Sequence, residues 1–338
     1  MHAERAPSFT HSARAPLEPT PDWPRLPPGL NLDRVVGVGV DSRGRILVAH
    51  RGERPLLRFR PDGAFDAEIG AEVMRKSTAY DLRGPAPVPI ATRHWLHGLH
   101  IDARDRVWVT DVGRHLVLAF SPEGRLEQVL GEDGCPGEDE GRFNQPTHVC
   151  VLPDGEIFIT DGYGNSRVVR RAPDGRFRLA WGGRGVEPGR FHTPHVIVRG
   201  PGDRLYVSDR ENDRLQVFDP EGNVLAVWEG LHSLDGLAFG PDGSLHASCG
   251  LDHAVIRLDG TGRPAAVWAR PGDLVYPHAL AFDATGALLA AETGDRARVL
   301  GRTPANHFVT EPREGPEGSR LSRWRLPPGA AQGSTQNE

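Results

Sequence analysis

Three histidines stand at the head of short apolar segments, and together they could hold a metal ion. They are His97, His195 and His278, followed by Gly-Leu, Val-Ile and Ala-Leu respectively. A neutral imidazole is a good zinc ligand, and three of them leave one coordination position open for a water molecule or a substrate oxygen. If the fold brings these side chains to one point, they predict a zinc site that can do chemistry.

A second group of candidates follows apolar segments elsewhere in the chain: Arg51, Tyr163 and Arg210. The neighbouring Asp161 and Asp209 recur at equivalent places, so we interpret them as residues that cap turns. The tyrosine and the two arginines do not recur. Arginine binds carboxylates through paired hydrogen bonds and tyrosine can transfer a proton, so these three predict a site for an anionic substrate. For each residue alone, a packing or surface role is the alternative.

The elements that must position these residues are six similar units of short apolar strands. Turns of the type Pro-Asp-Gly or Pro-Glu-Gly separate the third and fourth strands at 61–63, 122–124, 173–175 and 220–222. Proline presets the backbone of such a turn and glycine accepts the left-handed conformation. Four short strands recurring every ~40 to 50 residues are typical of a propeller blade, and no segment shows helical periodicity. We therefore predict an all-β, six-bladed β-propeller with four-stranded antiparallel blades.

This fold explains how distant histidines could meet. The innermost strand of each blade lines the central channel, and we call the residue at its head the ring position. The six ring positions are Val36, His97, Thr147, His195, Asp235 and His278. Histidine occupies every second blade, which places the three imidazoles about 120° apart around one axis. The alternative is that each histidine only binds a neighbouring loop; His148, beside the ring position of blade three, stays open between the two readings.

The repeats also suggest domain boundaries. We expect one propeller over residues 22–310, with the third strand of the last blade at 297–300, and mobile tails at 1–21 and 311–338. A long insertion at 71–92 is expected to cover part of the channel, because loops of this length are often functional.

Composition excludes several classes of partner. The net charge is −5 without a basic block, so we expect neither nucleic acid nor a membrane surface as a partner. Three cysteines cannot form a complete disulfide set, and no segment resembles a signal peptide or a membrane span. We expect a cytoplasmic monomer.

Several motifs carry a family resemblance. Residues 143–147 (FNQPT), 161–167 (DGYGNSR), 191–195 (FHTPH) and 209–214 (DRENDR) closely resemble the lyase domain of peptide-amidating enzymes. This family, peptidyl-α-hydroxyglycine α-amidating lyase, is a six-bladed propeller of NHL-repeat type. The similarity covers roughly residues 22–300.

The resemblance implies an activity and roles for the residues above. The family uses zinc held by three histidines to cleave a carbinolamide, an N–C(OH) unit bearing a carboxylate, into an amide and glyoxylate. The zinc ligands would match His97, His195 and His278. Tyr163 would match the base, Arg51 the catalytic arginine and Arg210 a further arginine of the active site. The substrate would be a peptidyl-α-hydroxyglycine or a small carbinolamide with a carboxylate.

The resemblance further implies a calcium ion in the channel, held partly by backbone carbonyls that match Val38 and Leu99. The family's aspartate ligand is replaced here by Ala279. A hard cation thereby loses its main charged ligand, so this replacement argues against calcium.

Two other functions fit a propeller. A non-catalytic NHL-repeat protein would use the channel mouth or the rim as a scaffold that binds a protein or a ligand. A lactone-hydrolysing propeller would surround calcium with acidic residues and asparagine, whereas this ring presents histidines.

Overall fold

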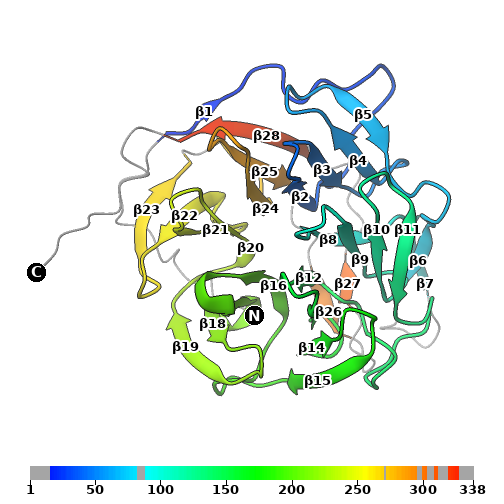
Figure 1. The fold of residues 1–338 in the computed structure, drawn as a ribbon, viewed down its shortest axis with the longest axis vertical. Coiled ribbons are helices and arrows are strands. Elements are labelled where there is room, and N and C mark those ends of the chain that lie inside the picture. Colours follow the sequence, from blue (N-terminus) through cyan, green and yellow to red (C-terminus); the bar gives the residue numbers. More distant parts are fainter. Residues whose placement is uncertain are drawn as a thin grey trace, which may run out of the picture.

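Six four-stranded antiparallel sheets surround a central axis in the computed structural model (Figure 1). The structure describes residues 16–81, 88–269, 272–294, 299–302, 308–310 and 319–326. The prediction of an all-β, six-bladed propeller is confirmed. Within these residues, no helix has the length and the apolar character that crossing a membrane requires.

The first five blades each follow one another along the chain, from the innermost to the outermost strand. Blade 1 comprises β2 (Gly37–Val40), β3 (Ile46–Ala49), β4 (Leu56–Phe59) and β5 (Phe65–Glu68). Blade 2 comprises β8 (Leu96–Ile101), β9 (Val107–Asp111), β10 (Leu116–Phe120) and β11 (Leu126–Leu130). Blade 3 comprises β12 (His148–Val151), β13 (Ile157–Asp161), β14 (Arg167–Arg171) and β15 (Phe177–Gly182). Blade 4 comprises β16 (Pro194–Arg199), β17 (Leu205–Asp209), β18 (Arg214–Phe218) and β19 (Val224–Glu229); blade 5 comprises β20 (Leu234–Phe239), β21 (Leu245–Cys249), β22 (Ala254–Leu258) and β23 (Pro264–Trp268).

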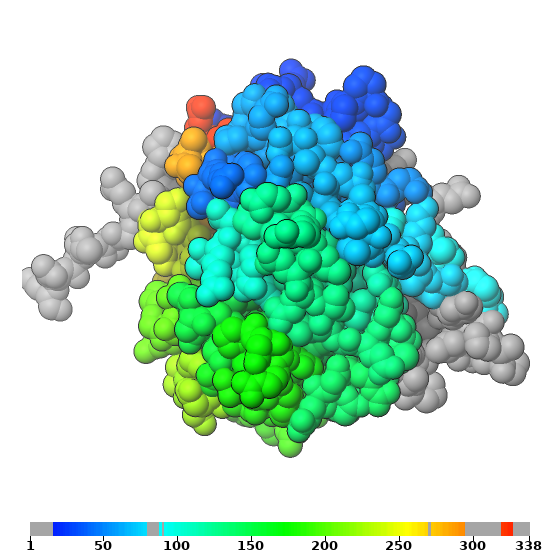
Figure 2. Space-filling view, turned by 45° about the vertical axis from the view of Figure 1, so that its right-hand side comes forward, coloured from blue at the N-terminus to red at the C-terminus, as the bar shows by residue number. Residues whose placement is uncertain are grey.

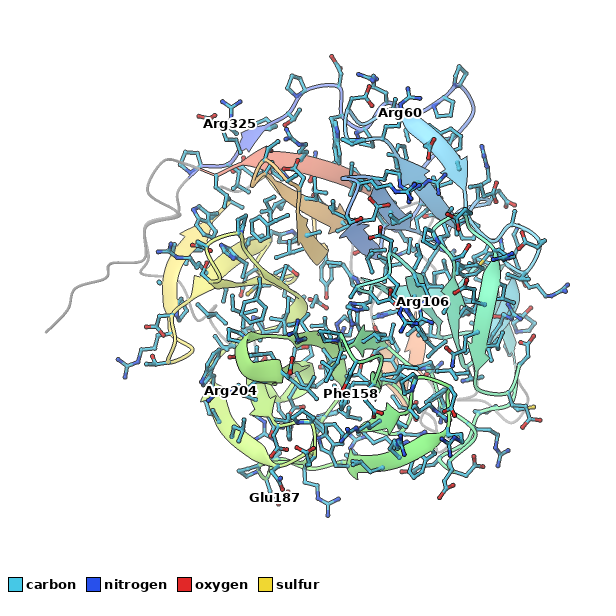
Figure 3. The ribbon with its side chains drawn as sticks, in the orientation of Figure 1. Arg60, Arg106, Phe158, Glu187, Arg204 and Arg325 are labelled. Carbon is cyan, nitrogen blue, oxygen red and sulfur yellow. The ribbon has the colours of Figure 1, made fainter. Side chains whose placement is uncertain are left out.

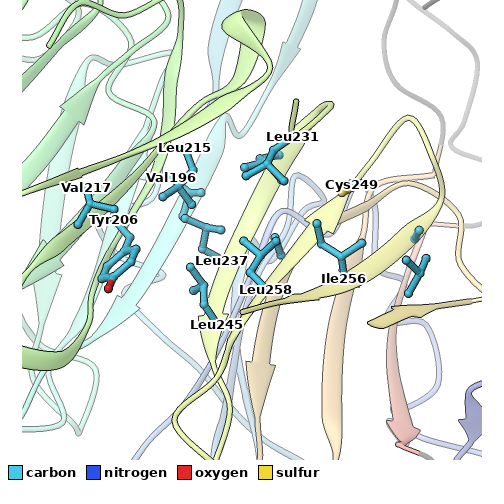
Figure 4. Close-up of a cluster of buried hydrophobic side chains, with 14 residues drawn as sticks. Val196, Tyr206, Leu215, Val217, Leu231, Leu237, Leu245, Cys249, Ile256 and Leu258 are labelled. Atoms are coloured by element: carbon cyan, nitrogen blue, oxygen red, sulfur yellow. The ribbon is translucent and has the colours of Figure 1, made fainter. Parts of the chain in front are cut away.

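The hydrophobic core lies between neighbouring blades. In the cluster of Figure 4, Val196 and Leu215 of blade 4 pack with Leu237 and Ile256 of blade 5. Another cluster joins blade 1 to blade 6 and so closes the ring. The middle strands of each blade are apolar on both faces because each face packs against a neighbouring blade. This packing fixes the relative positions of the innermost strands.

Blade 6 differs from its expected composition. Its inner strands are β24 (Pro277–Phe282) and β25 (Leu288–Glu292), but the third is β28 (Arg320–Arg325) and the outermost is β1 (Glu18–Pro19). The expected third strand at 297–300 is wrong, because β26 (Val299–Arg302) pairs instead with β27 (Phe308–Thr310).

The propeller therefore extends beyond its expected boundaries, residues 22 and 310, at both ends. Trp324 is buried on β28, and Glu292 binds Arg320 (3.0 Å), which secures β28 to β25. Pairing of β1 with β28 joins the two ends of the chain in one blade. The rest of the two expected tails, 1–15, 311–318 and 327–338, lies outside the described residues.

The insertion at 71–92 forms a hairpin of β6 (Ser77–Asp81) and β7 (Val88–Arg93). In Figure 1 these strands lie toward the periphery of the ring and away from its axis, so the described part of the hairpin does not cover the channel. Residues 82–87, between the two strands in sequence, lie outside the described residues. Trp95 anchors the base of the hairpin by donating its indole N–H to the Ser77 carbonyl (2.9 Å).

Charged side chains are common on the rim of the ring. Figure 2 shows the outer surface of blades 1 to 3, coloured from blue to green, and Figure 3 shows Arg60, Glu187 and Arg325 at the periphery. Exposed ion pairs such as Arg25 with Asp62 contribute little to stability. The charged groups that bear on function are the buried ones near the axis.

Candidate functional site

The three histidines of the ring position meet at the axis. His97 lies on β8, His195 on β16 and His278 on β24, and all three side chains are buried. Their ring centroids are 4.7 to 5.0 Å apart, and one nitrogen from each ring lies within 4.8 Å of the other two. The structure therefore brings together the three residues that the repeat pattern singled out.

The other three blades orient these histidines through backbone carbonyls. The Nδ1 of His97 donates to the carbonyl of Thr147 (2.7 Å), that of His195 to Asp235 (2.8 Å) and that of His278 to Val36 (2.7 Å). A carbonyl can only accept, so each Nδ1 carries the hydrogen and each Nε2 keeps its lone pair. Second partners of this kind set the tautomer and the direction of metal-binding histidines.

Burial keeps the three imidazoles neutral. It lowers the pKa of His278 to about 4, and it lowers the pKa values of His97 and His195 well below their ordinary value. Positive neighbours act in the same direction: Arg51 lies near His97, and Arg210 near His195. Three neutral rings with converging lone pairs fit a divalent zinc-type ion, which binds the unprotonated form.

Tyr163 places its hydroxyl against this cluster. The hydroxyl lies 2.7 Å from Nε2 of His97 and 3.2 Å from Nε2 of His195. The loop after β13 can carry the tyrosine there because glycines flank it: a Cβ at Gly162 would overlap the Pro194 carbonyl, and one at Gly164 would overlap the Asn144 side chain. The phenol is thus the polar group beside the histidines that can move a proton.

Arg210 lies on the blade 4 side of Tyr163. Its guanidinium carbon is 5.6 Å from the Tyr163 ring centroid. Its Nη1 donates to Asp235 (3.1 Å), while Nε and Nη2 contact Glu211 (3.0 and 2.9 Å). Burial lowers the pKa of Arg210, but its acidic neighbours, Tyr163, Glu211 and Asp235 among them, outweigh burial and raise that pKa well above the usual value.

Arg51 lies on the blade 1 side and is paired differently. Its Nε donates to the Leu96 carbonyl (3.1 Å), and its guanidinium lies 5.3 Å from the Trp95 ring centroid. Burial lowers its pKa to about 10, which leaves it charged at neutral pH. Within the described part of the chain, Arg51 is in no ion pair with a carboxylate. Its cation is therefore available to an anionic substrate.

Comparison with known proteins places the chain in a family. A family model for the NHL repeat matches residues 143–170. NHL repeat-containing protein 3 of Mus musculus is 32% identical over 285 residues, which cover 76% of this chain and 76% of that protein. The chain belongs to the NHL-repeat family. The family resemblance based on the motifs is confirmed.

Proteins named as amidating enzymes are similar to this NHL-repeat propeller. Peptidylglycine alpha-amidating monooxygenase of Rattus norvegicus is 35% identical over 63% of the chain, which spans only 24% of that protein. Peptidyl-alpha-hydroxyglycine alpha-amidating lyase 1 of Drosophila melanogaster is 31% identical over 58% of the chain and 39% of that protein. A streptogramin B lyase structure covers 88% of the chain and 95% of its own, with a TM-score of 0.57 and 15% identity, and shows the fold alone.

The channel beneath the histidines of this NHL-repeat protein forms a cavity of about 240 Å³. Val38, Leu99 and Ala279, the positions considered for calcium, all line it. Asp235 is the one carboxylate among the described residues that line the cavity, and it is already paired with Arg210. The cavity lining thus supplies no free carboxylate of the kind that calcium prefers.

His148 and Asp235 are the two positions that sequence reasoning left unassigned. His148 lines the cavity below the histidine cluster and is not one of the three converging residues. Asp235 occupies the ring position of blade 5 and contacts both His195 and Arg210. In the sequence, Asp235 is distinguished by its charge, because the other two non-histidine ring positions carry valine and threonine.

Proposed function

We propose that the protein is a zinc-dependent carbon–nitrogen lyase that cleaves an α-hydroxyglycine-type carbinolamide to an amide and glyoxylate. The observation that carries the proposal is the contact of the Tyr163 hydroxyl with two of three converging neutral histidines (2.7 and 3.2 Å). The similarity to a protein named as an amidating lyase, that of Drosophila melanogaster, supports the same reaction.

His97, His195 and His278 would hold the ion. When bound, zinc supplies a Lewis acid that lowers the pKa of an alcohol oxygen. The substrate bears one carboxylate, and Arg51 would bind it because that guanidinium has no carboxylate partner among the described residues. The hydroxyl-bearing carbon would then lie between Arg51 and Tyr163.

Tyr163 would move the proton. The substrate hydroxyl loses its proton, its oxygen forms the aldehyde C=O, and the C–N bond breaks with its electron pair on nitrogen. The nitrogen then takes up the proton, so the products are a neutral amide and glyoxylate. No water and no redox cofactor enters the balance, and the proton that leaves the hydroxyl equals the one that the amide gains.

The test uses purified chain loaded with zinc and the small substrate α-hydroxyhippurate. We expect about one zinc per chain and the release of glyoxylate and benzamide in equal amounts. The variant with both His97 and His195 changed to Ala should lose both the metal and the activity. Zinc-loaded wild-type protein that releases no glyoxylate from α-hydroxyhippurate or from a peptidyl-α-hydroxyglycine would rule the proposal out.

A second candidate is a non-catalytic NHL-repeat scaffold that binds a protein or ligand. The similarity to NHL repeat-containing protein 3 of Mus musculus, which spans 76% of both chains, favours it. The two candidates differ in the metal: a scaffold has no need of a zinc ion, whereas the lyase requires one per chain.

A further inference from the structure

Asp235 is hydrogen-bonded both to a histidine of the metal cluster and to an arginine of the site. It is the second residue of β20, the innermost strand of blade 5, and its side chain is fully buried. Its backbone carbonyl accepts the Nδ1 hydrogen of His195 (2.8 Å), and its carboxylate Oδ1 accepts from Nη1 of Arg210 (3.1 Å). Asp235 therefore links the histidine cluster to Arg210.

The orientation of Asp235 is held from the other side. Its second oxygen, Oδ2, accepts from the Ser233 hydroxyl (3.0 Å) and from the backbone N–H of Gly250 (3.2 Å). A buried carboxylate with several donors has a defined rotamer. The guanidinium that it binds is therefore held in a defined place as well.

The comparison with the other blades shows what the carboxylate adds. Val36 and Thr147 occupy equivalent ring positions and accept from His278 and His97 through the same backbone carbonyl. Neither has a charged side chain, so orienting a histidine needs only the backbone. The carboxylate of Asp235 is not needed to orient His195; it binds Arg210 instead.

Arg210 is therefore poorly placed to bind a substrate carboxylate. All three guanidinium nitrogens contact Asp235 or Glu211, and the group lies over the Tyr163 ring. Two carboxylates already compensate its charge. This separates the two arginines: Arg51 has no carboxylate partner in the described part of the chain, whereas Arg210 is held against the tyrosine.

We propose that Asp235 is a positioning residue that holds Arg210 against Tyr163 while its backbone orients His195. The inference rests on the proposed lyase function for its kinetic consequence. The substitution Asp235→Asn removes the negative charge but keeps the backbone carbonyl. Zinc content should therefore stay at the wild-type level, while kcat falls about 10-fold or more and KM changes less than threefold.

A double-mutant cycle separates positioning from general damage. In an Arg210→Met background, Asp235→Asn should change kcat by less than about twofold, because the guanidinium that it positions is already gone. The double variant also leaves no unpaired buried guanidinium, so it should fold even if Asp235→Asn alone does not. If the two effects simply multiply, Asp235 does not act through Arg210.

Asp209→Asn is the matched control. Asp209 and Arg214 form an equally buried pair (2.7 Å) on neighbouring strands of blade 4, outside the metal cluster. This variant should lose stability but keep kcat within about threefold of wild type.

A second readout needs no activity. In ¹⁵N-labelled protein, the Arg210 Nη1–H signal should be protected from exchange in wild type and in Asp209→Asn, because Nη1 donates to Asp235. It should lose protection in Asp235→Asn, while the His195 Nδ1 proton stays protected in all three. Unchanged Arg210 protection in Asp235→Asn would overturn the inference. Wild-type protein without lyase activity would instead refute the proposed function and leave this readout valid.

Discussion

The imidazole of His278 donates its Nδ1 hydrogen to the backbone carbonyl of Val36 at 2.7 Å, across the junction where the last blade meets the first. The two residues are 242 positions apart in the chain. Equivalent bonds run from His97 to Thr147 and from His195 to Asp235, so all six blades contribute to one cluster. A metal ion held there would connect three blades directly and the other three through these bonds.

Zinc should therefore stabilise the closed ring. At a free zinc concentration about 1,000 times the dissociation constant, we expect about 4 kcal/mol of added stability, seen as a rise in the thermal midpoint. The variant His278→Ala should show no such rise. A wild-type midpoint that zinc does not change would contradict this prediction.

Removing the Tyr163 hydroxyl should abolish proton transfer without removing the metal site. We expect Tyr163→Phe to lower glyoxylate release by roughly two or more orders of magnitude, with zinc content unchanged. The measurement is steady-state kinetics with α-hydroxyhippurate, alongside metal analysis of the same sample. An unchanged rate would take Tyr163 out of the mechanism.

Arg51 should act mainly on binding. Hydrogen bonds to a charged group contribute about 1.5–3 kcal/mol, so Arg51→Met should raise KM for a carboxylate substrate by roughly 10- to 150-fold. A substrate analogue in which the carboxylate is replaced by a neutral amide should bind wild type and variant alike. If the analogue is affected equally, Arg51 has a structural role instead.

Stability should fall in acid, partly through His50. Burial lowers the pKa of His50 from 6.5 to about 4. Its Nδ1 accepts backbone hydrogens from Asp33 and Gly52. The unfolded chain then binds the proton first, so this contribution to stability is present above pH 6.5 and is lost as the pH falls toward 4. The slope is at most about 1.4 kcal/mol per pH unit.

The variant His50→Asn keeps a side-chain acceptor but cannot titrate. Its free energy of unfolding, measured by urea denaturation between pH 4 and 7, should depend less steeply on pH than that of wild type. Parallel curves for the two proteins would show that His50 does not contribute.

Closure of blade 6 should depend on Trp324. Its side chain is buried on β28, and its indole N–H donates to the Ser322 hydroxyl (2.6 Å). Truncating a buried tryptophan costs about 3–5 kcal/mol, so Trp324→Ala should lower stability by that amount. The matched substitution Trp228→Ala, at a half-buried position of β19, should cost less. If the two variants lose the same amount of stability, closure of blade 6 does not depend on this contact.

The repeat pattern predicted much of this molecule because blade formation is local. Turn residues and apolar strands within each unit determine the four-stranded sheets, and equivalent positions in equivalent units then indicated which histidines share a level of the channel. His97, His195 and His278 could be identified in this way without knowledge of any contact.

The tertiary structure decided what depends on contacts between distant parts of the chain. In blade 6, β28 pairs with β25 and β1 pairs with β28, and the repeat period predicts neither pairing. Only packing shows that Asp235 and Glu211 pair with Arg210, whereas Arg51 has no carboxylate partner among the residues that the structure describes. Charge compensation acts through space over a few ångströms, so no local pattern along the chain reveals it.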